Sequence, residues 1–346
     1  MILGASGYVG GELMRLIDAH PEFELAGAIS NTLAGSRIGG LFANLSSAYP
    51  GMEFVCSDSW FHDIQEGSDV AFFSAAPHGA SAGAIAASLR IAAEKHYNMR
   101  VVDVSADFRY STPSAFSAIY GVEHAAPELF DSFVCAVPEH AGGIRRPHAG
   151  HPGCFATAAL LAAVPLVAAG LVTDDLYLTG ITGSTGSGRG PAPGTHHPER
   201  HGNLYAYKPL EHRHAPEIAT LVSAVCGNSP DVHFVPHSGP FARGIHMTLQ
   251  APLHSAATAD DIRHTFGEFY LASPFVHVVA GTPRLKDVVA SNQCHIGVAA
   301  DHSTVTVLCV IDNLVKGAAG GAMQWMNRLW SLPEHAGLMA ASPGWT

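Results

Sequence analysis

The sequence predicts an α/β protein of two domains, a parallel-sheet domain followed by an α+β domain with a mainly antiparallel sheet. Three observations lead to this fold class. The chain has 346 residues, enough for two domains. Short apolar strands alternate with helical segments up to about residue 150, a rhythm typical of a parallel sheet covered on both faces. Beyond that point, several apolar strands with turn signals between them indicate an antiparallel sheet with helices packed on it.

The first domain begins with a strand, a glycine-rich turn and a helix. Only residues 1–3 precede Gly4, whereas strands usually have about five residues, so the start of the chain looks trimmed or misassigned. A helix is predicted over residues 12–19 because apolar residues recur there at helical spacing. Later segments predict strands over residues 23–29, 69–74 and 100–105 and a helix of small residues over 80–93.

The second domain begins near a long apolar run that predicts a buried helix over residues 157–169. Residues 312–330 return to helix, and we expect this segment to fold back onto the first domain. The expected domains are therefore residues 1–150 with 313–346, and residues 151–312. Between these limits the patterns predict helices over residues 215–226 and 259–271 and strands over residues 175–182, 233–236, 244–251, 275–280 and 303–311.

Composition excludes several classes of function. The formal net charge is -11, which argues against nucleic acid and anionic membrane surfaces as partners. The longest apolar stretch, residues 158–172, contains Pro165 and is shorter than a membrane span. The six cysteines form no CxxC pair and no signal peptide is visible, so we expect a reduced, cytoplasmic protein without a metal site.

The turn Gly4-Ala5-Ser6-Gly7-Tyr8-Val9-Gly10 fits the pattern G-x-x-G-x-x-G between a strand and a helix. Glycines there allow a tight turn and a close approach of a pyrophosphate to backbone amides, which indicates a Rossmann-type dinucleotide site. The alternative is an ordinary glycine-rich loop.

The end of the second strand bears on which dinucleotide is bound. NAD sites tend to place Asp or Glu there for the ribose 2′-hydroxyl, and this chain has none. Ser30, Ser36 and Arg37 instead suit a 2′-phosphate, so the sequence favours NADP(H) over NAD. Arg37 has the alternative of a solvated loop charge.

Cys154, in the stretch HPGCFATA, follows a Pro-Gly turn and precedes the predicted buried helix. Backbone N–H groups and the helix dipole at such a position stabilise a thiolate, the nucleophilic form of cysteine. Beside a nicotinamide, this thiol suggests reduction of an acyl phosphate or oxidation of an aldehyde through a thioester. The alternative is an inert packed cysteine.

The stretch from Glu211 to Glu217, EHRHAPE, offers the best acid/base group. His214 stands just before a predicted helix, and Glu217 is spaced to orient a histidine. A metal site and chance clustering among 22 histidines remain alternatives, although HRH lacks a third ligand for zinc. Two further stretches suit anions: the Gly-rich loop 183–190, which contains Arg189, and residues 103–109, which end in Arg109.

Together these motifs resemble the N-acetyl-gamma-glutamyl-phosphate reductase family, relatives of aspartate-semialdehyde dehydrogenase. The likeness runs nearly end to end and rests on GASGYVGGE, DVSADFR, HPGCFATA, GSTGSGR, HRHAPEI and IDNLVKGAAGG. It implies a glyceraldehyde-3-phosphate dehydrogenase-like fold and NADPH-dependent reduction of an acyl phosphate in arginine biosynthesis. It also implies a small-molecule substrate and a homodimer or homotetramer formed through the second domain's sheet.

The resemblance further implies roles for individual residues. Cys154 would form the acyl thioester, with His214 as acid/base and Glu217 supporting it. Substrate contacts would come from Ser184, Gly186, Arg189, His212 and Arg213, with Arg109 as the phosphate ligand. Cofactor contacts would come from Ala75, Pro77, Ser105, Asn313 and Gly317, besides Gly4, Ser6, Gly7, Tyr8, Val9, Gly10, Ser30, Ser36 and Arg37.

Residues 191–211 depart from many members of that family in length and composition. They are similar to a branch that reduces an aminoadipyl phosphate borne on an acidic carrier protein in lysine biosynthesis. The negative net charge argues against such a carrier unless Arg200, Lys208 and Arg213 form a basic patch. An N-succinyl substrate, and a non-catalytic NADP-binding redox sensor, stay open as well.

Overall fold

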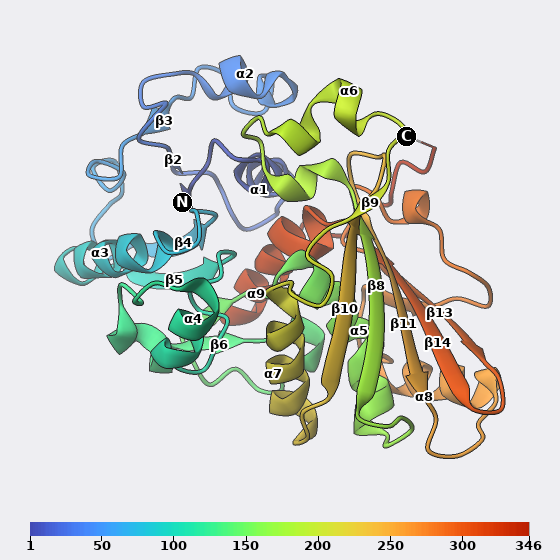
Figure 1. Ribbon diagram of the computed structural model, residues 1–346. Helices are drawn as coiled ribbons and strands as arrows, with labels where there is room; N and C mark the ends of the chain where they lie inside the picture. Colours follow the sequence, from blue (N-terminus) through green and yellow to red (C-terminus); the bar gives the residue numbers. More distant parts are fainter. Residues whose placement is uncertain (346) are drawn as a thin grey trace. The chain divides into compact units, whose positions relative to one another are not determined.

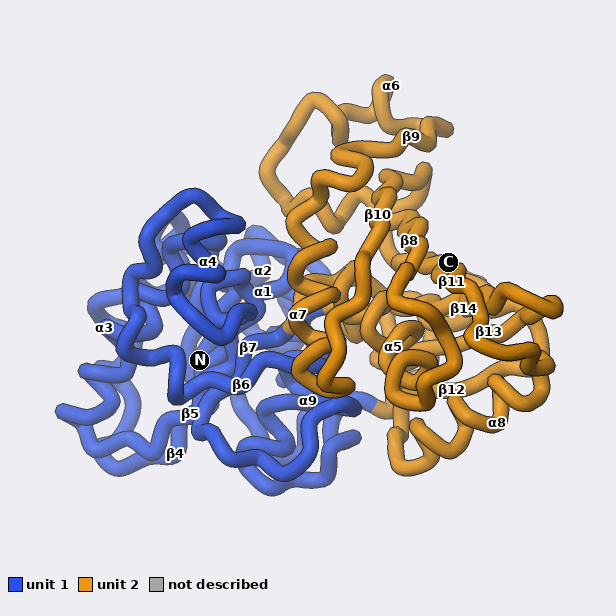
Figure 2. Tube along the Cα trace, turned by 60° about the horizontal axis from the view of Figure 1, so that its bottom comes forward, with its two compact units in different colours: residues 1–151, 318–338 blue, residues 152–317, 339–346 orange. Residues whose placement is uncertain are grey.

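The computed structural model describes residues 1–345 and divides the chain into two compact units (Figure 2). Unit 1 comprises residues 1–151 and 318–338, and unit 2 comprises residues 152–317 and 339–346. Residues 313–317 and the C-terminal residues from 339 onward thus cluster with unit 2, although the sequence assigned them to the first domain. One contact that ties this tail to unit 2 is the hydrogen bond from Ser342 Oγ to the carbonyl of Lys286.

Unit 1 contains a seven-stranded sheet in the order β3-β2-β1-β4-β5-β7-β6, and every neighbouring pair is parallel (Figure 1). Chain order reverses between β1 and β4, which is where open α/β sheets bind their ligands. The strands are β1 (Ile2–Leu3), β2 (Ala28–Ile29), β3 (Phe54–Val55), β4 (Asp69–Ser74), β5 (Asn98–Asp103), β6 (Phe133–Cys135) and β7 (His148–Gly150).

The helices of unit 1 cover this sheet. The last of them is formed by the returning segment and packs against α1 and β5, as the sequence predicts for residues after 312. They are α1 (Tyr8–Asp18), α2 (Ile38–Leu41), α3 (Ser81–Glu94), α4 (Pro113–Tyr120) and α9 (Gly320–Leu329), with short 3-10 turns η1 (Ala43–Leu45), η2 (Pro127–Ser132) and η3 (Pro138–His140).

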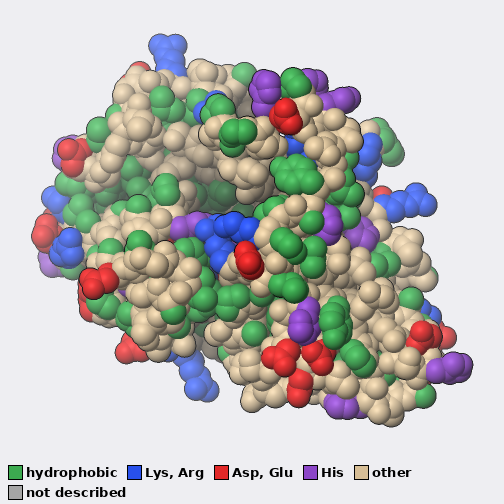
Figure 3. All heavy atoms as spheres, viewed as in Figure 1, with side chains coloured by type: hydrophobic (Ala, Val, Ile, Leu, Met, Phe, Trp, Pro, Cys, Tyr) green, Lys and Arg blue, Asp and Glu red, His purple; other side chains and the backbone are tan. Residues whose placement is uncertain are grey.

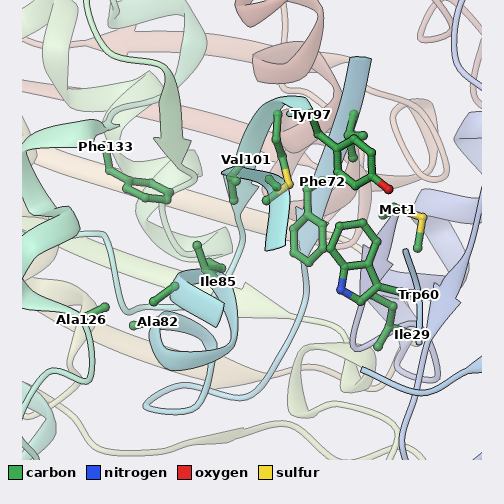
Figure 4. Close-up of a cluster of buried hydrophobic side chains, with 14 of the residues drawn as sticks. Met1, Ile29, Trp60, Phe72, Ala82, Ile85, Tyr97, Val101, Ala126 and Phe133 are labelled. Atoms are coloured by element: carbon green, nitrogen blue, oxygen red, sulfur yellow. The ribbon is translucent and has the colours of Figure 1, made fainter. Parts of the chain in front are cut away.

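The core of unit 1 is aromatic where the sheet meets the loop after β3. Trp60 contacts the rings of Phe72 and Tyr97 edge-on or tilted, at centroid distances of 5.6 and 6.3 Å (Figure 4). Phe72 comes from β4, and its neighbours Ile85 and Val101 come from α3 and β5. This core packs α3 and the loop after β3 against β4 and β5, two central strands of the sheet.

Unit 2 contains a second seven-stranded sheet, in the order β12-β13-β14-β11-β8-β10-β9. Four of its neighbouring pairs are antiparallel and two, β8 with β10 and β12 with β13, are parallel, so the sheet is mainly antiparallel as predicted. The strands are β8 (Asp175–Thr182), β9 (Tyr205–Ala206), β10 (Asp231–Ser238), β11 (Ile245–Pro252), β12 (Val276–Val278), β13 (Cys294–Ala300) and β14 (Thr304–Ile311).

One face of this sheet is covered by α5, with α7 and α8 packed against α5 (Figure 1). A Cβ at Gly180 of β8 would lie 2.5 Å from Cε1 of Phe155, so glycine is needed where α5 meets the sheet. The α-helices are α5 (Cys154–Ala168), α6 (His197–Arg200), α7 (His214–Cys226) and α8 (Ala259–Phe269). The 3-10 turns are η4 (Ser184–Ser187), η5 (Pro193–Thr195) and η6 (Leu285–Asp287), and a π-helical turn, η7, spans Val315–Ala319. Within residues 1–345, no helix combines the length and apolar character needed to cross a membrane.

Candidate active site

The cysteine singled out by the sequence is the first residue of α5. Gly153 precedes it in an extended conformation, and the thiol-bearing residue is partly exposed. Residues 155–166 are all buried, so the helix is anchored, and Cys154 lies in its first turn, where the N–H groups have no partner within the helix. The predicted thiol at a helix N-terminus is confirmed, although the helix begins at Cys154 and not at Thr157.

Glu217 links the beginnings of two helices. Its side chain is fully buried, and Oε1 accepts a 2.7 Å hydrogen bond from the backbone N–H of Gly153, directly before Cys154. Oε2 lies 4.0 Å from Nε2 of His214, which is a charge contact and longer than a hydrogen bond. The carboxylate therefore holds the turn that carries the thiol and faces the imidazole at the same time.

His214 is the first residue of α7 and is 7% exposed. Its backbone N–H donates to Nδ1 of His212 at 3.2 Å, and the two rings pack with centroids 4.6 Å apart. Burial, helped by the positive charges of Arg213 and Lys208, lowers the pKa of His212 to about 4. His212 is thus neutral near pH 7, and because Nδ1 accepts a hydrogen bond, its proton sits on Nε2.

A cavity of about 460 Å³ connects these residues; we call it the Cys154 cavity. It lies entirely in unit 2, at the ends of β8 and β10. Of the predicted catalytic and substrate residues, five line it: Cys154, Gly186, His212, Arg213 and His214. Glu217 stands behind His214, and Ser184, whose backbone N–H bonds Phe241, and the exposed Arg189 are not among the lining residues.

Seven lining residues were not predicted to contact the substrate, among them Tyr205, Tyr207 and Lys208, and Lys208 was predicted only as part of a basic patch. All three belong to the unusual segment 191–211, which adds β9 to the sheet edge by antiparallel pairing with β10. Burial, and the nearby charges of Cys154 and Tyr205, raise the pKa of Tyr207, so it presents a protonated hydroxyl. Repeated aromatic residues in YAYK were the available signal, but a two-residue strand leaves too little pattern to detect.

Arg200, from the same segment, does not join a basic patch. It is 8% exposed and donates to the backbone carbonyls of Asn203 and Phe241. Its role in this structure is to hold the segment together.

The segment after β14 packs against Cys154, which lines the cavity. The fully buried Asp312 accepts hydrogen bonds from Arg243 and from the backbone of Leu314, which leads into the π-helical turn. A Cβ at Gly317 in that turn would lie 2.8 Å from Cβ of Cys154, so Gly317 packs directly against the thiol-bearing residue. π-Helical turns often mark functional sites.

Asn313 ties the glycine-rich loop to the sheet. Its Oδ1 accepts from the backbone N–H of Gly244 at 2.6 Å, and its Nδ2 donates to Thr185 Oγ1 at 3.0 Å. These bonds position the loop that contains Gly186. The cofactor contacts expected of Asn313 and Gly317 stay predictions.

Two glycines of the turn in unit 1, Gly4 and Gly10, leave no room for a side chain. Gly4 has φ 75°, and a Cβ there would lie 2.5 Å from the carbonyl oxygen of Ala75 in the loop after β4. A Cβ at Gly10 would lie 2.5 Å from the carbonyl of Ala5. Gly7 precedes α1, whose first residues are Tyr8 and Val9. The turn and the loop of Ala75 and Pro77 therefore flank the point where strand order reverses, and they fit a dinucleotide pyrophosphate.

The end of β2 carries hydroxyl groups and no carboxylate. Ser30 Oγ donates to Ser6 Oγ at 3.1 Å, so two of the predicted cofactor residues come together. Ser36 and Arg37 are exposed in the loop before α2. Their contact with a 2′-phosphate stays a prediction.

Residues 103–109 bond mainly to their own unit. Asp103 is fully buried and accepts from the hydroxyls of Ser81 and Ser105, while burial raises its pKa to about 6. Arg109 is 5% exposed and donates to the carbonyls of Val104 and His151. These bonds give Ser105 and Arg109 structural roles, and their predicted ligand contacts stay predictions.

Both units match known protein families. Residues 1–134 match the family model "Semialdehyde dehydrogenase, NAD binding domain", and residues 154–313 match "Semialdehyde dehydrogenase, dimerisation domain". Among solved structures, aspartate semialdehyde dehydrogenase II from Vibrio cholerae has a TM-score of 0.65 at 16% identity, covering 95% of this chain and 96% of that one. The Candida albicans enzyme with NADP has a TM-score of 0.66 at 16% identity, with coverage of 95% and 97%. These structures share the predicted fold.

The curated relatives are more similar in sequence. A Methanopyrus kandleri protein named N-acetyl-gamma-glutamyl-phosphate reductase is 41% identical over 97% of this chain and 96% of its own. Proteins of the same name from Pelotomaculum thermopropionicum and Methanosarcina mazei are 38% and 37% identical, over 99% and 97% of this chain and 97% and 96% of their own. The chain therefore belongs to the N-acetyl-gamma-glutamyl-phosphate reductase family, has a nicotinamide dinucleotide-binding domain and is an oxidoreductase.

Proposed function

We propose that the protein reduces N-acetyl-gamma-glutamyl phosphate to N-acetylglutamate semialdehyde and phosphate with NADPH, a step of arginine biosynthesis. The observation that carries the proposal is the meeting of Cys154, His214 and Glu217 at the beginnings of α5 and α7, beside one cavity, in a chain of this family. The name of the curated relatives supports the identity of the substrate, and the geometry of the site supports a reaction through a thioester on Cys154.

Cys154 performs the first step. Its thiolate attacks the acyl carbon, the bond from that carbon to the phosphate oxygen breaks, and inorganic phosphate leaves with the bonding electrons. The product is a thioester on Cys154. Backbone N–H groups at the beginning of α5 stabilise the attacking thiolate, and Glu217 holds Gly153 so that these groups keep their positions.

His214 handles the proton of the second step. NADPH, when bound, would supply the hydride for the thioester carbon. His214, as general acid, gives a proton to the developing alkoxide, and it takes that proton back as the carbon–sulfur bond breaks. The aldehyde then leaves and Cys154 is again a thiolate. Glu217, 4.0 Å from Nε2, stabilises the protonated imidazole.

The dinucleotide is NADP(H) in this proposal. The end of β2 offers the hydroxyls of Ser30 and Thr32 and no carboxylate, and Arg37 lies in the loop that follows. An acidic residue at this place would repel a 2′-phosphate. The oligomer in this proposal is a homodimer or homotetramer formed by unit 2, in line with the family description of residues 154–313.

The reverse reaction tests the assignment. Protein is mixed with NADP, inorganic phosphate and N-acetylglutamate semialdehyde, and NADPH is followed by absorbance. We expect phosphate-dependent NADP reduction, with a higher kcat/KM for NADP than for NAD. Parallel arms contain the N-succinyl and carrier-borne aminoadipyl semialdehydes. Turnover only in one of these arms, or in none, would refute the N-acetyl assignment.

A further inference from the structure

One cationic side chain that lines the Cys154 cavity, that of Lys208, has no role in the mechanism proposed above. The proposed substrate has two anionic groups, the phosphoryl group and a carboxylate. Two basic side chains, Lys208 and Arg213, are found among the cavity's lining residues within 1–345. Over the same residues, the Lys208 ammonium group makes no ion pair and no side-chain hydrogen bond. It is therefore available to a ligand.

The backbone at Lys208 adopts a conformation that lysine rarely takes. Lys208 has φ 45° and Leu210 has φ 61°, both in the left-handed region. The backbone N–H groups of Tyr207 and Leu210 donate to the carbonyls of Pro236 and Phe234 in β10, at 3.0 and 2.9 Å. Bonds on both sides thus force this turn, and such strain tends to persist at functional positions.

The charge of Lys208 acts on a neighbouring lining residue, His212. Burial and Arg213, and after them Lys208, lower the pKa of His212, which lies between Lys208 and His214 in the sequence. Figure 3 shows a group of Lys and Arg side chains near the middle of the visible face, on a chain whose formal net charge is -11. A local cationic site on an acidic chain favours an anionic ligand.

We propose that Lys208 binds an oxyanion of the substrate, so that segment 191–211 supplies a specificity-determining residue of the active site. The inference rests on the proposed function and extends it. The shared chemistry is a charge-assisted hydrogen bond from Nζ to a carboxylate or phosphoryl oxygen. The reverse reaction separates these two groups, because the semialdehyde has the carboxylate and inorganic phosphate is a separate substrate.

The test compares Lys208→Gln, Lys208→Arg and Lys208→Asn with the wild type. In Lys208→Gln we expect KM for one of the two substrates to rise about tenfold or more, the loss of one charge-assisted hydrogen bond, with a small change in kcat. A rise for phosphate assigns the phosphoryl group, and a rise for semialdehyde assigns the carboxylate. Lys208→Arg should recover most of the loss. Lys208→Asn should lose binding without a lower Tm, because asparagine tolerates positive φ.

Lys95→Gln is the matched control, since Lys95 is exposed in unit 1 and its loss removes the same charge. A second readout does not need turnover: protection of Cys154 from iodoacetamide by inorganic phosphate and, separately, by N-acetylglutamate. One of these should need about tenfold more ligand in Lys208→Gln than in wild type. Unchanged protection by both ligands would overturn the proposal even if the wild type showed no turnover. So would a lower Tm in all three variants with equal losses in kcat.

Discussion

At the scale of single residues, the proton-transfer role proposed for His214 can be tested most directly. It lines the cavity with Cys154, faces Glu217 and packs against a neutral histidine. His214→Asn keeps a polar side chain of similar reach but cannot transfer a proton at this position. We expect turnover to fall by roughly two to four orders of magnitude, the usual range for general acid/base catalysis. Steady-state kinetics measures it, and a loss under about threefold would remove the role.

His148 provides a prediction about stability and pH. It is 6% exposed in β7, its Nδ1 accepts from the backbone N–H of Val101, and burial, helped by Arg100, lowers its pKa to about 4. The unfolded chain, with an ordinary pKa near 6.5, binds this proton more tightly than the folded chain does. His148 therefore stabilises the fold fully above about pH 6.5, and that contribution is lost as the pH falls towards about 4.

His148→Asn retains an acceptor for Val101 and removes the titration. Between about pH 7 and about pH 5, the wild type should lose roughly 2 kcal/mol more of its unfolding free energy than the variant does. Urea unfolding at the two pH values measures this difference. Asp103, whose raised pKa acts in the opposite direction, is common to both proteins and cancels. Equal losses in the two proteins would show that His148 titrates normally.

At the scale of elements, the π-helical turn η7 sets the position of the nucleophile. A Cβ added by Gly317→Ala would lie 2.8 Å from Cβ and 3.1 Å from Cα of Cys154, so the beginning of α5 must move. A shift of this kind is expected to lower kcat about a hundredfold while the protein stays folded. Gly267→Ala in α8 is the control, because a Cβ there meets nothing within 4 Å. Circular dichroism checks that both variants are folded, and steady-state kinetics measures their kcat. Full activity in Gly317→Ala would contradict the packing of Gly317 against Cys154.

The elements also show what sequence patterns can and cannot predict. Strands β4, β8 and β14 were predicted nearly to the residue, because their apolar runs are buried in the middle of a sheet. Residues 23–29 predicted a strand, yet only Ala28–Ile29 pairs, since residues 23–26 find no neighbouring strand and stay partly or fully exposed. Strand β13 was missed because its histidine, glycine and alanines dilute the apolar alternation.

The site was predictable where one short motif contains it. Cys154 and His214 stand at helix beginnings that Pro-Gly and Ala-Pro signal, so local rules suffice. Lys208 and Tyr207 enter the cavity through the pairing of β9 with β10, about thirty residues apart. Gly317 and Asp312 act through contacts across the unit, and no local pattern encodes such contacts. Arg109 follows a strand end, where its Nε and one Nη donate to backbone carbonyls, and its predicted phosphate contact stays a prediction.

At the scale of the whole molecule, the domain matched to NAD binding and the proposed nucleophile belong to different units. The glycine turn lies in unit 1, and Cys154 lies in unit 2. Cys154→Ser replaces sulfur by a far weaker nucleophile and leaves unit 1 untouched. We expect no measurable reduction and a Kd for NADP within about twofold of wild type, since the serine keeps the shape of the site. Calorimetric titration with NADP measures the second quantity, and a large rise in Kd would contradict this separation of roles.

The proposed mechanism depends on a covalent bond between the substrate and Cys154. The most direct measurement mixes the protein with N-acetyl-gamma-glutamyl phosphate without NADPH, quenches with acid and determines peptide masses. The account predicts an acyl group on the peptide that contains Cys154, formed together with an equal amount of inorganic phosphate and absent from Cys154→Ser. Phosphate release in the wild type without any acylated Cys154 peptide, under conditions in which the enzyme turns over once NADPH is added, would contradict it.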